Sequence, residues 1–154
     1  MALTLHTPAP DFTTLTDGGR KITLHKYKGK YIVLYFYPKD NTETCTKQAC
    51  AFRDNMKRIT KLGAVVIGIS PDTVKKHDKF KSDYGLNFIL ACDEDKSICE
   101  AYGVWAEKSM YGRKYMGVLR TTYIIDPTGT ISHVFENVKV AGHVDAVIAS
   151  LGTP

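Results

Sequence analysis

The chain has 154 residues, of which 44% are hydrophobic and 24% charged, and its formal net charge is +5. These values are typical of one soluble globular domain, which we expect over residues 1–154. The Lys and Arg residues form no basic–aromatic stripe, which argues against a nucleic-acid partner. No signal peptide or membrane-length apolar run is evident, and four cysteines are too few for a disulfide scaffold. We therefore expect a cytoplasmic protein with no membrane partner.

The first expected elements are a hairpin and a buried strand. Asp-Gly-Gly at 17–19 separates the β-prone runs 12–15 and 21–24, which predicts an N-terminal β-hairpin. Residues 31–37 are almost continuously apolar, as in a central strand that is covered on both faces, and Pro38 ends this strand.

A long helix is expected over 42–62, closed by Gly63. Its inward face is marked by residues that recur at intervals of three and four, namely Cys45, Ala49, Phe52, Met56 and Ile59.

Strands and helices alternate through the rest of the chain. Residues 64–69 predict a second buried strand, and Ser70-Pro71-Asp72 predicts a helix with Pro71 at its first position that ends at Gly85. The remaining expected elements are a strand at 88–91, a helix at 95–102, a hairpin formed by 121–125 and 130–135, and an amphipathic helix at 144–151. This order predicts an α/β fold, with a mixed central β-sheet flanked by helices on both faces.

Cys45 is the strongest candidate for a reactive residue. It falls just beyond the carboxyl end of a strand, where reactive groups of α/β folds tend to lie. In the first turn of the expected helix, unpaired backbone N–H groups and the helix dipole favour the thiolate over the thiol. Because the thiolate is the nucleophilic form, this position suggests redox catalysis.

Cys50 lies about 140° further round the expected helix, beside Arg53 and Lys57 on a more solvated side. Residues five apart in an intact helix have Cα atoms about 8.7 Å apart, whereas the Cα atoms of disulfide-bonded cysteines are rarely more than about 7 Å apart. A disulfide between Cys45 and Cys50 therefore requires local unwinding of the helix. The alternative is that both thiols only pack in the core.

A wider motif includes both cysteines. Pro38-x-x-x-Thr42-x-x-Cys45, with Cys50 five residues further on, resembles the active-site pattern of the peroxiredoxins, in particular the PrxQ or bacterioferritin comigratory protein subfamily. The resemblance continues through 36–40, 49–54, 68–70, 93–95, 102–105 and 120–126. The subfamily commonly has Pro-Gly before the cysteine, where this chain has Glu43-Thr44, and we expect Glu43 to face water.

The resemblance implies a thioredoxin-like fold and a thiol-specific peroxidase that reduces hydrogen peroxide and organic hydroperoxides in antioxidant defence. Cys45 matches the peroxidatic cysteine, and Cys50 the resolving cysteine of an intrachain disulfide that thioredoxin or glutaredoxin reduces. Thr42 matches the hydroxyl that binds the peroxide, Pro38 the residue that shields the sulfur, and Arg120 the guanidinium that stabilises thiolate and transition state. Without the resemblance, Thr42 is equally a plain helix N-cap and Arg120 equally a salt-bridged surface residue.

Other interpretations stay open. Cys92 and Cys99 fit inert buried thiols, although either could resolve Cys45 in place of Cys50. A thiol–disulfide oxidoreductase of the same fold would have Cys-x-x-Cys, where this chain has four residues between its cysteines. A redox sensor that passes its oxidation to a partner protein is a non-enzymatic alternative.

No metal or organic cofactor is expected. The five histidines, at positions 6, 25, 77, 133 and 143, show no ligand spacing, and the chain has no phosphate-binding loop or dinucleotide motif. We expect a monomer.

Overall fold

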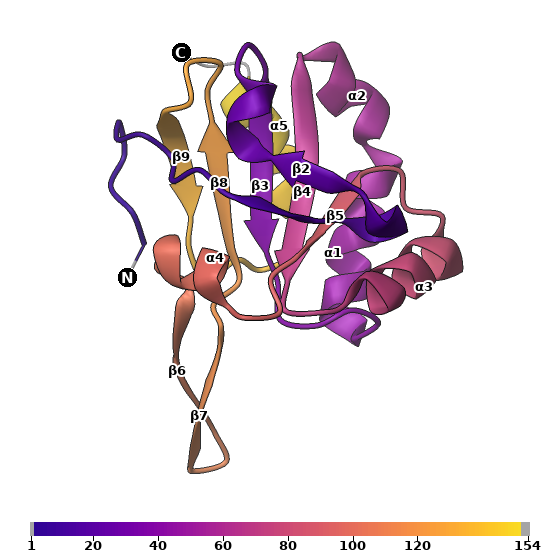
Figure 1. Ribbon diagram of the computed structural model, residues 1–154, viewed down its shortest axis with the longest axis vertical. Coiled ribbons are helices and arrows are strands. Elements are labelled where there is room, and N and C mark those ends of the chain that lie inside the picture. Colours follow the sequence, from indigo (N-terminus) through magenta and orange to yellow (C-terminus); the bar gives the residue numbers. More distant parts are fainter. Residues whose placement is uncertain (1, 152–154) are drawn as a thin grey trace.

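A five-stranded mixed sheet organises the computed structural model, which describes residues 2–151 (Figure 1). Its strand order is β5-β4-β3-β8-β9, in which β3, β4 and β5 are parallel, β8 is antiparallel to β3, and β9 is antiparallel to β8. The strands are β3 (Tyr31–Phe36), β4 (Ala64–Ser70), β5 (Ile89–Cys92), β8 (Thr121–Ile125) and β9 (Ile131–Phe135). The expected mixed central sheet is confirmed.

Helices cover both faces of this sheet. They are α1 (Glu43–Asp54), α2 (Met56–Lys61), α3 (Val74–Tyr84), α4 (Ser97–Ala101) and α5 (His143–Leu151). Side chains along β3 alternate between two buried clusters, because successive residues of a strand face opposite sides. Val33 and Tyr35 pack with α1, α2, α3 and α5, whereas Leu34 and Phe36 pack with α4 and the N-terminal segment. Within residues 2–151, no helix is long and apolar enough to cross a membrane.

The N-terminal hairpin is also confirmed. It consists of β1 (Thr13–Leu15) and β2 (Lys21–Thr23), joined through a 3-10 turn at Asp17–Gly19. In the second expected hairpin, β8 and β9 pair around the turn at 126–130.

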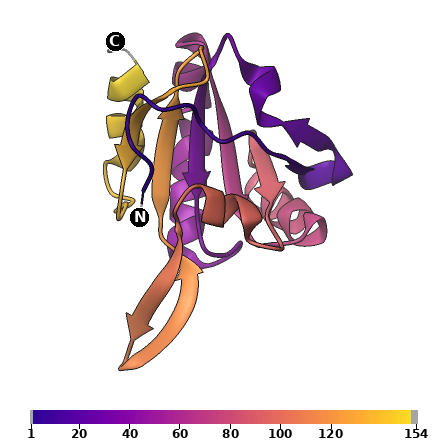
Figure 2. The same cartoon turned by 60° about the vertical axis from the view of Figure 1, so that its left-hand side comes forward.

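A hairpin that the sequence analysis missed projects from the body of the molecule (Figure 2). It is formed by β6 (Trp105–Met110) and β7 (Arg113–Val118), and it exposes Met110, Tyr111 and Met116. Much of both faces is exposed, so the period-two alternation that marks a half-buried strand is absent. The turn has φ values of 52° at Tyr111 and 76° at Gly112, as in a two-residue type I′ turn.

Two expected helices differ from those observed. The helix expected over 42–62 is broken at Asn55, where φ is −113° and ψ is 9°, and the side-chain amide of Asn55 donates to the Ala51 carbonyl at 2.8 Å. The helix expected from Ser70 begins at Val74 instead. Ser70 ends β4, and the hydroxyl of Thr73 caps α3 by accepting from the backbone N–H of Lys76 at 3.2 Å.

Gly68 on β4 lies against the ring of Tyr35. A Cβ atom at Gly68 would stand 2.9 Å from two carbons of that ring, well inside normal van der Waals contact. The ring is stacked between Tyr37 and Phe52, at centroid distances of 5.3 and 4.7 Å, so it has little room to move away. Gly68 therefore allows the close approach of Tyr35 to β4.

We expect Gly68→Ala to lower the free energy of unfolding by about 1–3 kcal/mol, the usual effect of overpacking a core. Guanidinium denaturation measures this loss. The same substitution in a Tyr35→Leu background should have a smaller effect, because the ring it meets is gone. Equal losses in both backgrounds would show that contact with Tyr35 is not the cause.

Candidate active site

The loop between β3 and α1 places Cys45 in the first turn of a helix, as expected. Thr42 is the N-cap residue, with extended backbone, and its hydroxyl donates to the carbonyl of Lys39 at 2.9 Å. Pro38 is half-buried at the end of β3. The thiol of Cys45 is buried, with 2% of the residue exposed, so the helix dipole acts on it with little screening by water.

Arg120 reaches Cys45 from the opposite side of the loop. It precedes β8, which pairs antiparallel with β3 so that Thr121 stands opposite Phe36, and the segment before β8 therefore lies beside the start of the loop. Arg120 Nη2 donates to Cys45 Sγ at 3.3 Å. The interpretation of Arg120 as a salt-bridged surface residue is wrong, because its guanidinium contacts Cys45 and Gln48 and forms no ion pair with the acids of residues 2–151. A fixed cation at this distance favours the thiolate.

Gln48 completes this arrangement, and the sequence analysis missed it. Its side chain is fully buried one turn after Cys45, and its Oε1 accepts from Arg120 Nη1 at 2.6 Å. The guanidinium is therefore held at two points. Gln48 Nε2 has no hydrogen-bond partner among residues 2–151. A polar residue three positions after Cys45, on the inward helix face, was the signal that could have revealed it.

His143 is the second residue near the guanidinium that the sequence analysis missed. Burial, and then the positive charge of Arg120, lower its pKa to about 4. Its Nε2 lies 2.9 Å from the hydroxyl of Thr122, and its ring meets Phe52 edge-on. His143 is therefore neutral at neutral pH and brings no positive charge of its own.

Cys50 lies on α1 as expected, half-buried and on a different side of the helix from Cys45. All four cysteines are free thiols in this structure. Glu43 does face water, since its side chain is 84% exposed and accepts from Lys47 at 3.2 Å. The acid in the first turn of α1 thus points away from the buried thiol.

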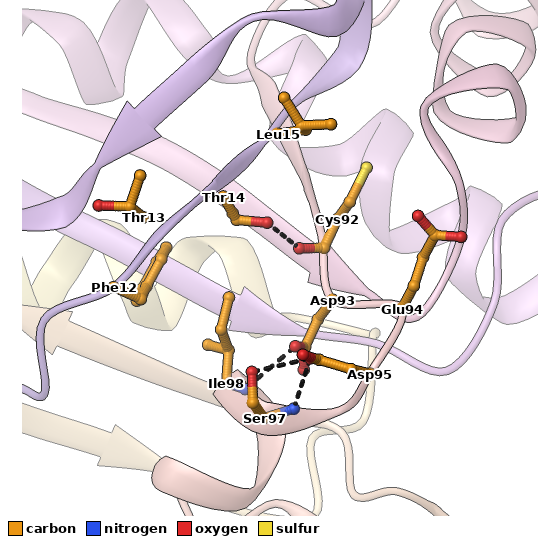
Figure 3. Close-up of a pocket in the computed structure, with 10 residues that line it drawn as sticks. All are labelled: Phe12, Thr13, Thr14, Leu15, Cys92, Asp93, Glu94, Asp95, Ser97 and Ile98. Carbon is orange, nitrogen blue, oxygen red and sulfur yellow. Dashed lines mark hydrogen bonds between the residues drawn. The ribbon is translucent and has the colours of Figure 1, made fainter.

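The other two cysteines lie outside this site. Cys99 is fully buried, and burial together with Asp93 raises the pKa of its thiol well above the usual range. Cys92 lines a pocket of about 310 Å³ between β1 and the turn before α4, which Figure 3 shows. The residues expected to react with peroxide are not among those that line this pocket, which is separate from the thiol of Cys45.

Three buried side chains of metal-ligating type lie behind the loop, although the sequence spacing did not group them. Ligand atoms of Asp40, Asp72 and His77 all lie within 4.8 Å of one another. His77 Nδ1 and Asp40 Oδ2 are 2.6 Å apart, which is a direct hydrogen bond and leaves no space for an ion between them. The expectation that the chain needs no metal stays a prediction.

Comparison with known proteins agrees with the sequence resemblance. Residues 5–134 match the AhpC/TSA family. A putative peroxiredoxin bcp of Coxiella burnetii is 49% identical over 98% of this chain and 100% of its own. The peroxiredoxin Bcp of Bacillus subtilis is 44% identical over 98% of this chain and 96% of its own.

Solved structures that resemble this chain are also peroxiredoxins of the PrxQ type. The peroxiredoxin Q of Xanthomonas campestris is 39% identical, with a TM-score of 0.90 over 96% of this chain and 95% of its own. A cysteine-to-serine mutant of PrxQ from Xylella fastidiosa is 33% identical, with a TM-score of 0.93 over 98% of this chain and 96% of its own. The thioredoxin-like fold is thereby confirmed.

Fold and relatives together define a thiol-dependent peroxidase, which is an oxidoreductase. The chain belongs to the AhpC/TSA family and, within it, to the Bcp/PrxQ peroxiredoxins.

We expect Gln48→Ala to slow alkylation of Cys45 at neutral pH by about tenfold. The substitution removes the acceptor that fixes Arg120, and a charge-assisted hydrogen bond of this kind contributes about 1.5–3 kcal/mol. Iodoacetamide labelling, followed at the Cys45 peptide by mass spectrometry, measures the rate. Lys47→Ala is the matched control, because Lys47 lies on the same helix but pairs with exposed Glu43. Equal rates in the two variants would contradict a role for Gln48.

Proposed function

We propose that the chain reduces hydrogen peroxide and organic hydroperoxides at Cys45, with Cys50 as the resolving cysteine and an external dithiol as reductant. The observation that supports this most strongly is the 3.3 Å contact from Arg120 Nη2 to the buried sulfur of Cys45. The helix N-terminus and the guanidinium both favour a thiolate at that sulfur.

In the first step, the thiolate of Cys45 attacks the distal oxygen of the hydroperoxide. An S–O bond forms while the O–O bond breaks, and the leaving oxygen takes the electron pair and a proton to become water or an alcohol. Cys45 is left as a sulfenic acid. Arg120 stabilises this step because its N–H groups face the place where negative charge moves from sulfur to oxygen.

Thr42 and Pro38 complete the peroxide site. The hydroxyl of Thr42 already donates to the Lys39 carbonyl, which leaves lone pairs on its oxygen that can accept the O–H of a hydroperoxide. Pro38, half-buried at the end of β3, excludes water and bulky thiols from the sulfur.

Organic hydroperoxides have support from a relative. The bacterioferritin comigratory protein of Xanthomonas campestris, 39% identical and with a TM-score of 0.90, is described for its alkyl peroxide reduction activity and for trapped intermediate and ligand complexes. The share of sequence and fold in common favours the same substrate class here.

In the second step, the thiol of Cys50 attacks the sulfur of the sulfenic acid, and the disulfide forms as water leaves. Because an intact helix holds residues five apart too far from each other to bond, the first turns of α1 unwind. The half-buried side of α1 that carries Cys50 then gives a dithiol protein access to the disulfide. Thioredoxin or glutaredoxin in the cytoplasm serves as that reductant for a monomeric enzyme.

Cys45→Ser should abolish peroxide reduction, since a hydroxyl offers no comparable nucleophile at neutral pH. Cys50→Ser should still consume one equivalent of peroxide but lose thioredoxin-dependent turnover, and its Cys45 should over-oxidise more readily. Peroxide consumption with excess thioredoxin measures both effects. Many turnovers by the unmodified protein identify an enzyme, whereas a single slow turnover identifies a redox sensor. Full turnover by Cys50→Ser would assign resolution to Cys92 or Cys99.

Amide exchange across residues 42–52 should be faster in the disulfide form than in the dithiol form, because α1 must unwind to join the two cysteines. Strands β3 and β4 serve as the internal control and should exchange equally slowly in both forms. Hydrogen exchange with peptide mass spectrometry gives this comparison, together with a map of the linked cysteines. Equal protection of α1 in both forms would point to a different partner for Cys45.

A further inference from the structure

The loop between β3 and α1 is anchored by one buried side chain, Asp40, of which 6% is exposed. Its Oδ1 accepts from the hydroxyl of Tyr37 at 2.6 Å, and its Oδ2 lies 2.6 Å from Nδ1 of His77 on α3. Its backbone N–H donates to Asp72 Oδ2 at 2.8 Å. The loop is therefore tied to the residue that follows β3, to α3 and to the segment that follows β4.

The ring of His77 donates at both nitrogens. Its Nε2 lies 3.0 Å from the carbonyl oxygen of Ala91 on β5, which can only accept, and its Nδ1 faces the carboxylate of Asp40. Burial alone would lower the pKa of His77, but its hydrogen bonds to Asp40 and Cys92 and their charges raise that pKa to about 10. The titratable groups around the pair are Tyr37, Asp72 and Cys92.

The other residues of the loop offer little to hold it in place. Lys39, Asn41 and Thr42 are exposed, and Asn41 has a positive φ of 61°. Asp40 is thus the side chain through which the centre of the loop contacts the core. A buried ion pair adds little net stability compared with apolar residues of the same volume, but it fixes the groups that it joins. The Asp40–His77 pair is therefore better suited to fix the position of the β3–α1 loop than to stabilise the fold.

We infer that Asp40 and His77 are positioning residues of the peroxide site, because they clamp the β3–α1 loop onto α3 and β5 and so set where Pro38 and Thr42 lie. This inference rests on the proposed function. Neither residue touches the peroxide. A displacement of about 1 Å in groups that orient a reactant can slow a reaction by about 100-fold.

The test compares four variants by the rate of the first step, peroxide attack on Cys45, in single-turnover experiments with hydrogen peroxide. Asp40→Ala removes the clamp and should slow attack by about 10- to 100-fold. Ile131→Ala is the control for general destabilisation, because it truncates a fully buried residue on β9 in the cluster on the opposite face of the sheet. It should attack peroxide at the wild-type rate even if its midpoint of thermal unfolding is lowered as much as that of Asp40→Ala.

Asp40→Asn keeps the shape of the side chain and its hydrogen bonds. The asparagine can donate to Nδ1 of a neutral His77 and still accept from Tyr37, so the clamp survives at neutral pH. Because these hydrogen bonds survive, Asp40→Asn should attack peroxide at close to the wild-type rate. In the wild type, the folded pKa of His77, about 10, lies above the ordinary 6.5, so the ion pair holds at neutral pH and is lost as pH rises through about 10.

The Asp40→Asn rate should therefore exceed the Asp40→Ala rate by about 10- to 100-fold at neutral pH, as expected where the conservative variant restores the clamp. Peptides over 37–42 should also exchange amide hydrogens faster in Asp40→Ala than in Ile131→Ala.

An Asp40→Asn rate as low as that of Asp40→Ala, or an Asp40→Ala deficit no larger than that of Ile131→Ala, would overturn the inference. Tyr37→Phe removes only the hydroxyl that donates to Asp40 Oδ1, so it remains decisive if Asp40→Ala does not fold. It should slow peroxide attack severalfold, and a wild-type rate in this variant would overturn the inference. A wild type that fails to react with peroxide at Cys45 would instead reject the proposed function.

Discussion

The contact between the Arg120 guanidinium and the Cys45 sulfur joins residues 75 positions apart in the chain, and the surrounding structure serves to maintain it. Arg120 stands where it does because β8 pairs with β3 in one register, with Thr121 opposite Phe36. Since a slip of one residue would turn every side chain of a strand to the other face, the buried residues on both sides of β3 protect that register. The two buried clusters, one on each face of the sheet, thus determine the surroundings of the Cys45 thiol.

Around this contact, the charged groups are arranged so that the positive charge of Arg120 faces the sulfur of Cys45. His143 is kept neutral by burial and by Arg120, and Gln48 offers the guanidinium a neutral acceptor where a carboxylate would compete with the thiolate. Glu43, the acid nearest in sequence, points into water and pairs with Lys47. Among residues 2–151 the buried Nε2 of Gln48 has no hydrogen-bond partner, which costs about 1–3 kcal/mol by the usual desolvation penalty.

Much of the fold could be predicted from the sequence, since apolar runs and helical periodicity mark β3, β4 and α1 directly. The β6–β7 hairpin could not, because it packs on little and its sequence carries no alternation. The break at Asn55 depends on one side-chain hydrogen bond to Ala51 and leaves the apolar period intact. The motif located Cys45 and its neighbours in sequence, but the contacts of Arg120, Gln48 and His143 depend on strand pairing, which spacing alone does not encode.

The distance in sequence between Cys45 and Arg120 also matters while the protein is being synthesised. Chains are synthesised from the N-terminus, so Cys45 and α1 emerge well before the strand that carries the cation to them. Until β8 joins the sheet beside β3, the thiol lacks its guanidinium and has the modest reactivity of an ordinary cysteine. The order of synthesis therefore prevents the contact between Arg120 and Cys45 from forming until β8 has joined the sheet.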